Sequence, residues 1–173
     1  ISITDGQIYL ESDLFNSGQR PAMNVGTSVS RVGGAAQIKA VEQVAGKLRL
    51  DLAQYRELAA FAQFASDLDE RTQKQLTRGE KLTALLRQNW DEPMAVEEQV
   101  LVIFSGTRGY LDDIQTELIP MYQKELISYV KAVNPDLLPR IAKEKKLDEK
   151  MESELDNLTK DFIAQFKETH DGE

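Results

Sequence analysis

IKAVEQVAGKLRLDLAQYRELAAFAQF, residues 38–64, is the stretch that decides the fold class of this chain of 173 residues. Its apolar side chains recur every three or four residues, which places them on one face of a helix. They are Val41, Val44, Leu48, Leu52, Tyr55, Ala59 and Ala62. The spacing predicts one long amphipathic helix from Ile38 to about Phe64.

Helical spacing continues along the rest of the chain. Asp67 or Asp69 is placed to cap a second helix, which we expect to end before Gly79, and residues 81–88 predict a short third one. Residues 143–146, Lys-Glu-Lys-Lys, follow Pro139 and indicate a solvated connector.

Prolines and glycines mark the remaining boundaries. A buried stripe follows Pro93 and ends at Gly106 and Gly109, and a helix that opens at Pro120 ends at Asn134–Pro135. The last amphipathic helix carries Met151, Leu155, Leu158, Phe162 and Phe166. The predicted fold is therefore mainly α, with residues 38–173 forming an all-α bundle of six or seven helices.

Residues 1–37 have a different character. Ile1-Ser2-Ile3 alternates apolar and polar side chains as a strand does, and Asp5-Gly6 and Asn16-Ser17-Gly18 are turn signals. So few strands cannot bury a sheet face by themselves. We therefore expect this part to be the truncated end of an α/β domain, in a chain that begins inside a longer polypeptide.

Composition narrows the possible partners. The net charge is −8, there is no cysteine, and no apolar run approaches the roughly 20 residues of a membrane-spanning helix. Acidity argues against binding to nucleic acid and to anionic lipid. The expected partner is a basic protein, with no nucleic acid and no insertion into a membrane.

The most specific stretch is NVGTSVSRVGGAAQ, residues 24–37, in which small residues surround the single cation Arg31. Together with Arg20-Pro21-Ala22 before it and ISITDGQ at residues 1–7, it resembles the alpha subunit of the F-type ATP synthase. QYRE at 54–57 and AFAQF at 60–64 continue the likeness. Residues 1–37 would then end a nucleotide-binding α/β domain, and 38–173 would be the subunit's C-terminal helical bundle.

The resemblance implies a function in a complex. The alpha subunit is regulatory and non-catalytic. It alternates with beta subunits in a ring around a central rotor, the gamma subunit, with a peripheral stalk, the delta subunit. The complex makes ATP from ADP and phosphate using a proton gradient, or hydrolyses ATP, as a peripheral complex on an energy-transducing membrane, here expected on the cytoplasmic face of a bacterial plasma membrane.

Two residues are implied at the catalytic interface. Arg31 would be an arginine finger that reaches ATP on a neighbouring beta subunit, where a planar guanidinium stabilises the charge that develops in phosphoryl transfer. Without the resemblance, a surface ion pair or a contact at a helix start is the default interpretation of Arg31. Ser2 would lie near the same interface, and a strand serine bonded to neighbouring backbone is an equal alternative.

A second nucleotide site is implied on the alpha subunit itself, with ATP or ADP and Mg²⁺ in the full-length protein. Arg20 and Pro21 match one element of its adenine pocket, and Gln88 matches the first glutamine of a Gln-x-Gln element. Trp90 stands at the second glutamine, and an indole cannot supply an amide's paired donor and acceptor. The alternative for Trp90 is a partly buried packing residue.

Other residues have weaker assignments. Asp67 and Asp69 would lie in a loop facing the rotor, although capping of the next helix explains them equally, and no metal site is expected. The chain has no phosphate-binding Gly-x-x-x-x-Gly-Lys-Ser/Thr run, so we expect it to bind no cofactor and to be inactive alone. The alternative function is a free-standing helical interaction module with no catalytic role.

Overall fold

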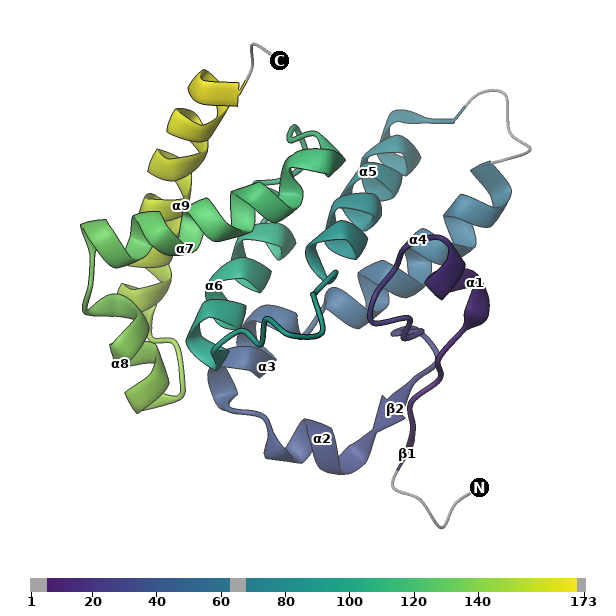
Figure 1. The fold of residues 1–173 in the computed structure, drawn as a ribbon, viewed down its shortest axis with the longest axis horizontal. Coiled ribbons are helices and arrows are strands. Elements are labelled where there is room, and N and C mark those ends of the chain that lie inside the picture. Colours follow the sequence, from purple (N-terminus) through teal and green to yellow (C-terminus); the bar gives the residue numbers. More distant parts are fainter. Residues whose placement is uncertain (1–5, 63–67, 171–173) are drawn as a thin grey trace.

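The computed structural model describes residues 6–62 and 68–170, and these are mainly helical, as predicted (Figure 1). A short antiparallel pair of strands and two short helices come first, followed by seven α-helices and one 3₁₀ turn within these ranges. The elements are β1 (Gly6–Gln7), α1 (Ser12–Asn16), β2 (Val29–Ser30), α2 (Arg31–Ala36), α3 (Lys39–Ala45), α4 (Leu48–Ala62), α5 (Glu70–Leu85), α6 (Val96–Thr107), η1 (Thr116–Leu118), α7 (Ile119–Val133), α8 (Leu137–Glu144) and α9 (Glu149–His170).

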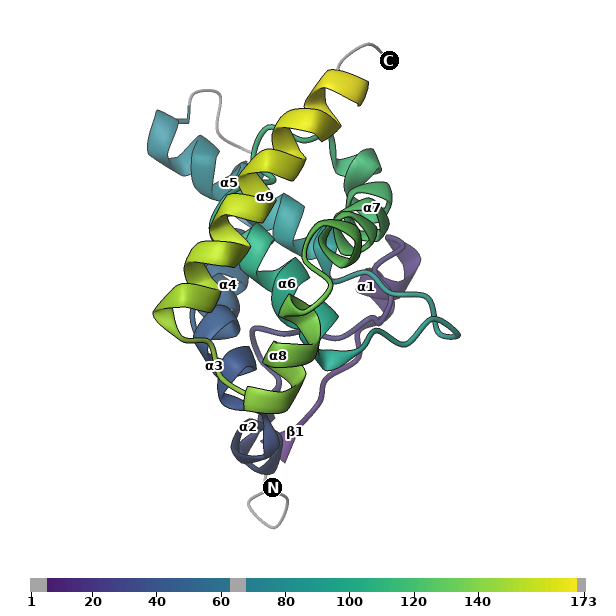
Figure 2. The same ribbon diagram turned by 90° about the vertical axis from the view of Figure 1, so that its left-hand side faces the viewer.

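Helix α6 lies at the centre of the bundle. It contacts α3, α5, α7, α8 and α9, which surround it in Figures 1 and 2. Val100 and Leu101, on different sides of α6, are both completely buried, and Ser105 is too, with its hydroxyl donating to the carbonyl of Val102 at 2.8 Å. Gly106 completes the fit, because a Cβ there would lie 2.6 Å from Leu85 Cδ2 on α5.

The single helix predicted from Ile38 to Phe64 is wrong, because two helices occupy this region. Helix α3 ends at Ala45, Gly46 follows as its C-cap, and α4 begins at Leu48. Glycine weakens a helix interior by about 1 kcal/mol relative to alanine, so a break is cheapest there. Val44 and Leu48, on the two sides of the break, are both buried, so the apolar periodicity survives although the helix does not.

The boundary predicted before Gly79 is also wrong. Helix α5 runs without interruption from Glu70 to Leu85 and replaces the predicted short helix at 81–88. Gly79 is buried where α5 packs on α4, and a Cβ on it would lie 2.2 Å from the Tyr55 ring carbon Cγ. The glycine therefore permits close helix packing instead of ending the helix.

The predicted connector after Pro139 is partly a helix. Leu137, Leu138 and Ile141 of α8 are buried, and Pro139 sits in the first turn, where its missing N–H breaks no helical hydrogen bond. The helix ends at Lys145 in a left-handed conformation with φ 57°, and the Lys145 carbonyl accepts from Ala40 N at 3.0 Å. That bond ties α8 to α3.

The boundaries predicted around α7 and α9 are confirmed. Pro120 stands in the first turn of α7, which ends before Asn134. The apolar face of α9 is buried at Met151, Leu155, Leu158, Phe162 and Phe166. Helix α9 reaches His170, whose ring centroid lies 4.4 Å from that of the Phe166 ring, so the polar residues after Phe166 are helical as well.

Residues 6–37 are held to the bundle by polar contacts. Strand β1 pairs with β2, Gly6 opposite Ser30, and the peptide bond before Pro21 is cis. The Glu11 carboxylate accepts from Arg56 Nη2 of α4 at 2.7 Å and from the Asn24 amide. The strand of Ile1-Ser2-Ile3 lies outside the described residues, and the domain division after residue 37 stays a prediction.

We predict that Gly79→Ala lowers the free energy of unfolding by about 1–3 kcal/mol, because the added methyl group would overlap the Tyr55 ring. The measurement is chemical denaturation followed by circular dichroism. Gly34→Ala in α2 is the matched control, since no atom lies within 4 Å of the added Cβ, and we expect no loss there. Equal destabilisation by both substitutions would contradict the packing argument.

We predict that acid loosens residues 9–24. The Arg56 guanidinium, and then the Asn24 amide, hold the pKa of Glu11 below its usual value. The contact therefore contributes stability above the ordinary pKa of a glutamate and loses it as the pH falls through the lowered value. Amide exchange in residues 9–24, corrected for intrinsic rates, should rise toward about pH 3.

Glu11→Gln should remove much of that pH dependence, whereas Glu57→Gln, an exposed glutamate of α4, should leave it unchanged. An unaltered pH profile in Glu11→Gln would show that another group controls the segment.

Candidate functional site

Arg31 begins α2 directly after strand β2. The Ser30 hydroxyl caps this helix by accepting from Gly33 N at 2.9 Å, so the turn that presents Arg31 has a fixed start. The Arg31 side chain is exposed, and the ion pairs and hydrogen bonds of the described residues do not include it. Of the two default interpretations, the surface ion pair finds no partner in this part of the chain, whereas a place at a helix start is what the structure shows, since Arg31 is the first residue of α2.

Apolar side chains are exposed beside Arg31. Val29 and Val32 flank it in sequence and are 40% and 60% exposed, and Ile8 and Leu10, next to the paired strand, are 55% and 72% exposed. A cluster of exposed apolar side chains on a soluble domain is typical of a surface that another chain covers. Arg31 thus stands on a surface suited to a protein partner.

Arg20 and Gln88, predicted to share a nucleotide pocket, lie together. The Gln88 N–H donates to the Arg20 carbonyl at 2.9 Å, and both residues line a cavity of about 580 Å³ beside α6 and α7. The Arg20 guanidinium lies over the Phe15 ring, 4.4 Å from its centroid. Two segments far apart in sequence therefore meet at one cavity, while its use as a nucleotide pocket stays a prediction.

Trp90 and Pro21 are placed differently. Trp90 is 96% exposed and does not line that cavity, so the alternative of a partly buried packing residue is wrong for it. Pro21 is exposed and also outside the lining. Of the four residues, Arg20 and Gln88 are the two that the structure brings together there.

The polar groups of this cavity are partly engaged already. The Gln88 amide Nε2 donates to the Glu92 carbonyl at 2.9 Å, which leaves its Oε1 as the free half of the amide. The Glu92 carboxylate also lines the cavity, and the Asn89 amide and then Lys124 hold its pKa below the usual value. The cavity therefore combines retained negative charge with the Gln88 amide oxygen and the further amides of Asn89, Gln99 and Gln123. It is an incomplete match to an adenine pocket built on a Gln-x-Gln pair, because Trp90 holds the second position outside the lining.

Asp69 is a helix cap. Its Oδ1 accepts from Thr72 N at 3.0 Å and its Oδ2 from Thr72 Oγ1 at 2.6 Å, at the start of α5. These bonds to Thr72 hold the pKa of Asp69 below its usual value. Capping, one of the two interpretations left open, is confirmed for Asp69. Asp67 and Ser2 lie outside the described residues.

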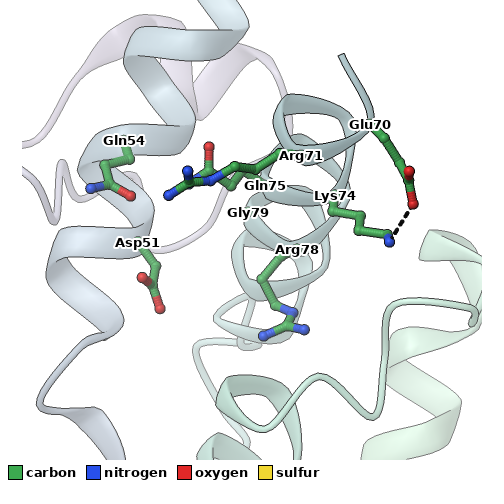
Figure 3. A pocket seen from close by; sticks show the side chains of 8 residues that line it. All are labelled: Asp51, Gln54, Glu70, Arg71, Lys74, Gln75, Arg78 and Gly79. Atoms are coloured by element: carbon green, nitrogen blue, oxygen red, sulfur yellow. Dashed lines mark hydrogen bonds and ion pairs between the residues drawn. The ribbon is translucent and has the colours of Figure 1, made fainter. Parts of the chain in front are cut away.

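Bases accompany the acids at the start of α5, which the sequence analysis missed. Figure 3 shows a cavity of about 520 Å³ between α4 and α5, with Gln54 and Asp51 of α4 facing Arg71 of α5. Lys74 pairs with Glu70 at 2.6 Å. The i, i+3 spacing of Arg71 and Lys74 was a detectable signal for a mixed, not purely acidic, surface.

Searches for two other features had negative results. In residues 6–62 and 68–170, no group of three or more histidine, aspartate or glutamate side chains could hold a metal ion. Among the helices that the structure describes, none is both long enough and apolar enough to cross a membrane.

Comparison with known proteins identifies the class. Residues 37–162 match the family described as the ATP synthase alpha/beta chain, C-terminal domain. Because the match covers most of the chain, the chain belongs to this family. The resemblance to the F-type alpha subunit is thereby confirmed for its C-terminal portion.

A curated relative makes the alpha type explicit. The chain is 57% identical over 166 residues to the ATP synthase subunit alpha of Aquifex aeolicus (strain VF5). The alignment covers 96% of this chain and 33% of that protein, so the chain spans about a third of the length of the relative.

Proposed function

We propose that this chain acts as part of the alpha subunit of a proton-translocating ATP synthase, which makes ATP from ADP and phosphate at the expense of a proton gradient. The identity of 57% across nearly the whole chain to an ATP synthase subunit alpha carries the proposal. The complex would be peripheral on an energy-transducing membrane, on the cytoplasmic face of a bacterial plasma membrane.

Arg31 is proposed as the residue that serves catalysis. A guanidinium keeps its charge at any working pH and offers forked donors to the oxygens of a transferring phosphoryl group. The exposed apolar side chains around it support a protein partner that holds the nucleotide, namely the beta subunit. Ser2 is proposed to lie near the same interface.

The rotor and the peripheral stalk complete the proposed assembly. The connection between α4 and α5, which includes Asp67 and Asp69, would face the gamma subunit. The bases Arg71 and Lys74 beside it suggest that the contacting rotor surface carries both signs of charge. The delta subunit of the stalk is inferred from the family alone.

A nucleotide site on the full-length subunit is a weaker proposal. ATP or ADP with Mg²⁺ would place its adenine toward Arg20, Pro21 and Gln88, and nucleotide held there would serve regulation. The bound nucleotide would supply charge and the metal, while this chain contributes amide groups, that of Gln88 among them, and the walls of the cavity beside α6. The chain alone, without a phosphate-binding loop in its sequence, is proposed to be inactive.

We predict that Arg31→Ala slows multi-site ATP hydrolysis by the assembled complex about a thousandfold while assembly remains intact. Arg31→Lys should recover only part of the rate, because lysine keeps the charge but loses the planar fork. Turnover would be measured by phosphate release and assembly by gel filtration. Arg49→Ala, at an exposed arginine of α4, is the matched control with unchanged turnover.

Unaltered turnover in Arg31→Ala would refute the catalytic role and favour the alternative, a free-standing helical interaction module. If the chain were such a module, Arg31→Ala would also leave unchanged the ATP turnover of any ATPase to which the chain is added.

We predict that Trp90→Gln in the full-length subunit strengthens binding of ADP at its own site. Position 90 lies just outside the cavity in this chain, and a glutamine there restores the second amide of the Gln-x-Gln element to an adenine that extends past Gln88. The measurement is the fluorescence of a trinitrophenyl nucleotide itself on binding, because the substitution removes the single tryptophan of this chain. Trp90→Ala is the control, and equal gains in both variants would mean that removing the indole, not adding the amide, is what matters.

A further inference from the structure

A separate cavity lies where residues 14–26 cover α4 and α5. Its volume is about 340 Å³, at the lower end of the roughly 300–1,000 Å³ of small-molecule pockets. Leu14, Leu52, Ala59 and Leu86 provide apolar walls from three separate segments. Leu86 and Arg87 line both this cavity and the one that Arg20 and Gln88 line, so the two cavities are neighbours, whereas Leu52, Tyr55 and Ala59 line this one alone.

The charged residues that line this cavity are all of one sign, unlike those of the other two cavities. Its lining contains two arginines, Arg56 and Arg87, and no carboxylate. By contrast, Asp51 and Glu70 line the cavity of Figure 3, and Glu92 lines the cavity beside α7. The chain as a whole carries a net charge of −8, but every charged residue that lines this pocket is a cation. The pocket is therefore complementary to an anion.

The two arginines are not equivalent. Arg56 is already paired with Glu11 at 2.7 Å, which compensates its charge. Arg87 donates from Nε to Gln19 Oε1 at 3.2 Å, and no ion pair among the described residues includes it. The terminal nitrogens of Arg87 are therefore the donors with capacity for a ligand.

Tyr55 lies beside Arg87 and adds a second donor. Its ring rests against Gly79, which fixes its orientation. Burial raises the pKa of the Tyr55 hydroxyl, and the negative charge of Glu80 raises it further, whereas the positive charge of Arg87 lowers it. Both charged groups therefore lie near the hydroxyl. The hydroxyl stays protonated at neutral pH and can donate a hydrogen bond.

We propose that this cavity binds a small carboxylate with an apolar body. The carboxylate would accept from Arg87 and the Tyr55 hydroxyl, and the body would lie on Leu52, Ala59 and Leu86. The ligand carboxylate would neutralise the charge of Arg87. The apolar surfaces of the ligand and of the cavity would both be removed from water. The site does not depend on Arg31 or on nucleotide, so it stands independently of the proposed ATP synthase function.

The test is titration of the whole 173-residue chain with 4-phenylbutyrate, followed by two-dimensional NMR. We expect saturable shifts at the backbone amides of Leu52, Ala59 and Leu86. The uncharged analogue 4-phenyl-1-butanol has the same apolar body. We expect its affinity to be lower by a factor of about ten or more, because it cannot form an ion pair with Arg87.

Variants locate the site. Arg87→Gln should weaken 4-phenylbutyrate binding about tenfold, and Ala59→Trp should abolish it by filling the cavity. Arg71→Gln, an exposed arginine of α5 outside this cavity, should leave affinity unchanged, with circular dichroism checking the fold of each variant. The proposal is overturned by an absence of saturable shifts, by equal affinity for acid and alcohol, or by equal weakening in Arg87→Gln and Arg71→Gln.

Discussion

Burial of α6 on all sides is the constraint on which the rest of the structure depends. A helix that is apolar around its whole circumference must be surrounded, and α6 is surrounded by five others. Val100, Leu101, Val102 and Phe104 are between 0% and 3% exposed. Each such side chain contributes roughly 1.5–3 kcal/mol on leaving water. The five helices around α6 therefore each turn an apolar face toward it, while α4 packs on α5 and α3 outside this layer.

This arrangement explains which parts of the fold could be predicted from the sequence. Helices α7 and α9 each have a single buried face and clear ends, such as Pro120 and Asn134, so local pattern suffices. The errors arose where contacts from distant residues decide. Gly79 stays helical because α4 approaches it, and α8 is helical because Leu137 and Ile141 reach the core. The contact at Gly79 leaves no periodic signal in the sequence, whereas Leu137, Leu138 and Ile141 do have helical spacing, which the emphasis on Pro139 and the charged run after it overlooked.

For the candidate sites, too, some features could be predicted from sequence motifs and others could be seen only in the structure. Arg20 and Gln88 were grouped by the resemblance alone, and the structure places them side by side through one backbone hydrogen bond at 2.9 Å, with their role in binding nucleotide still a prediction. The exposure of Trp90 did not follow, because a tryptophan in sequence carries no sign of whether a partner covers it. Similarly, the motif around Arg31 identified the residue, whereas its exposed apolar surroundings were visible only in three dimensions.

Polar contacts hold residues 6–37 against the bundle, whereas burial of apolar side chains holds the core together. No fully buried apolar residue of the described chain lies in residues 6–37, and Val25 is the residue there that packs partly against the core. The boundary is held instead by Glu11 on Arg56, Gln19 on Arg87 and Arg20 on Gln88. Part-buried polar bonds of this kind contribute little net free energy because water replaces them when they open, whereas separating the helices around α6 would expose the core. Local opening of the chain is therefore expected to cost less at this boundary than within the bundle.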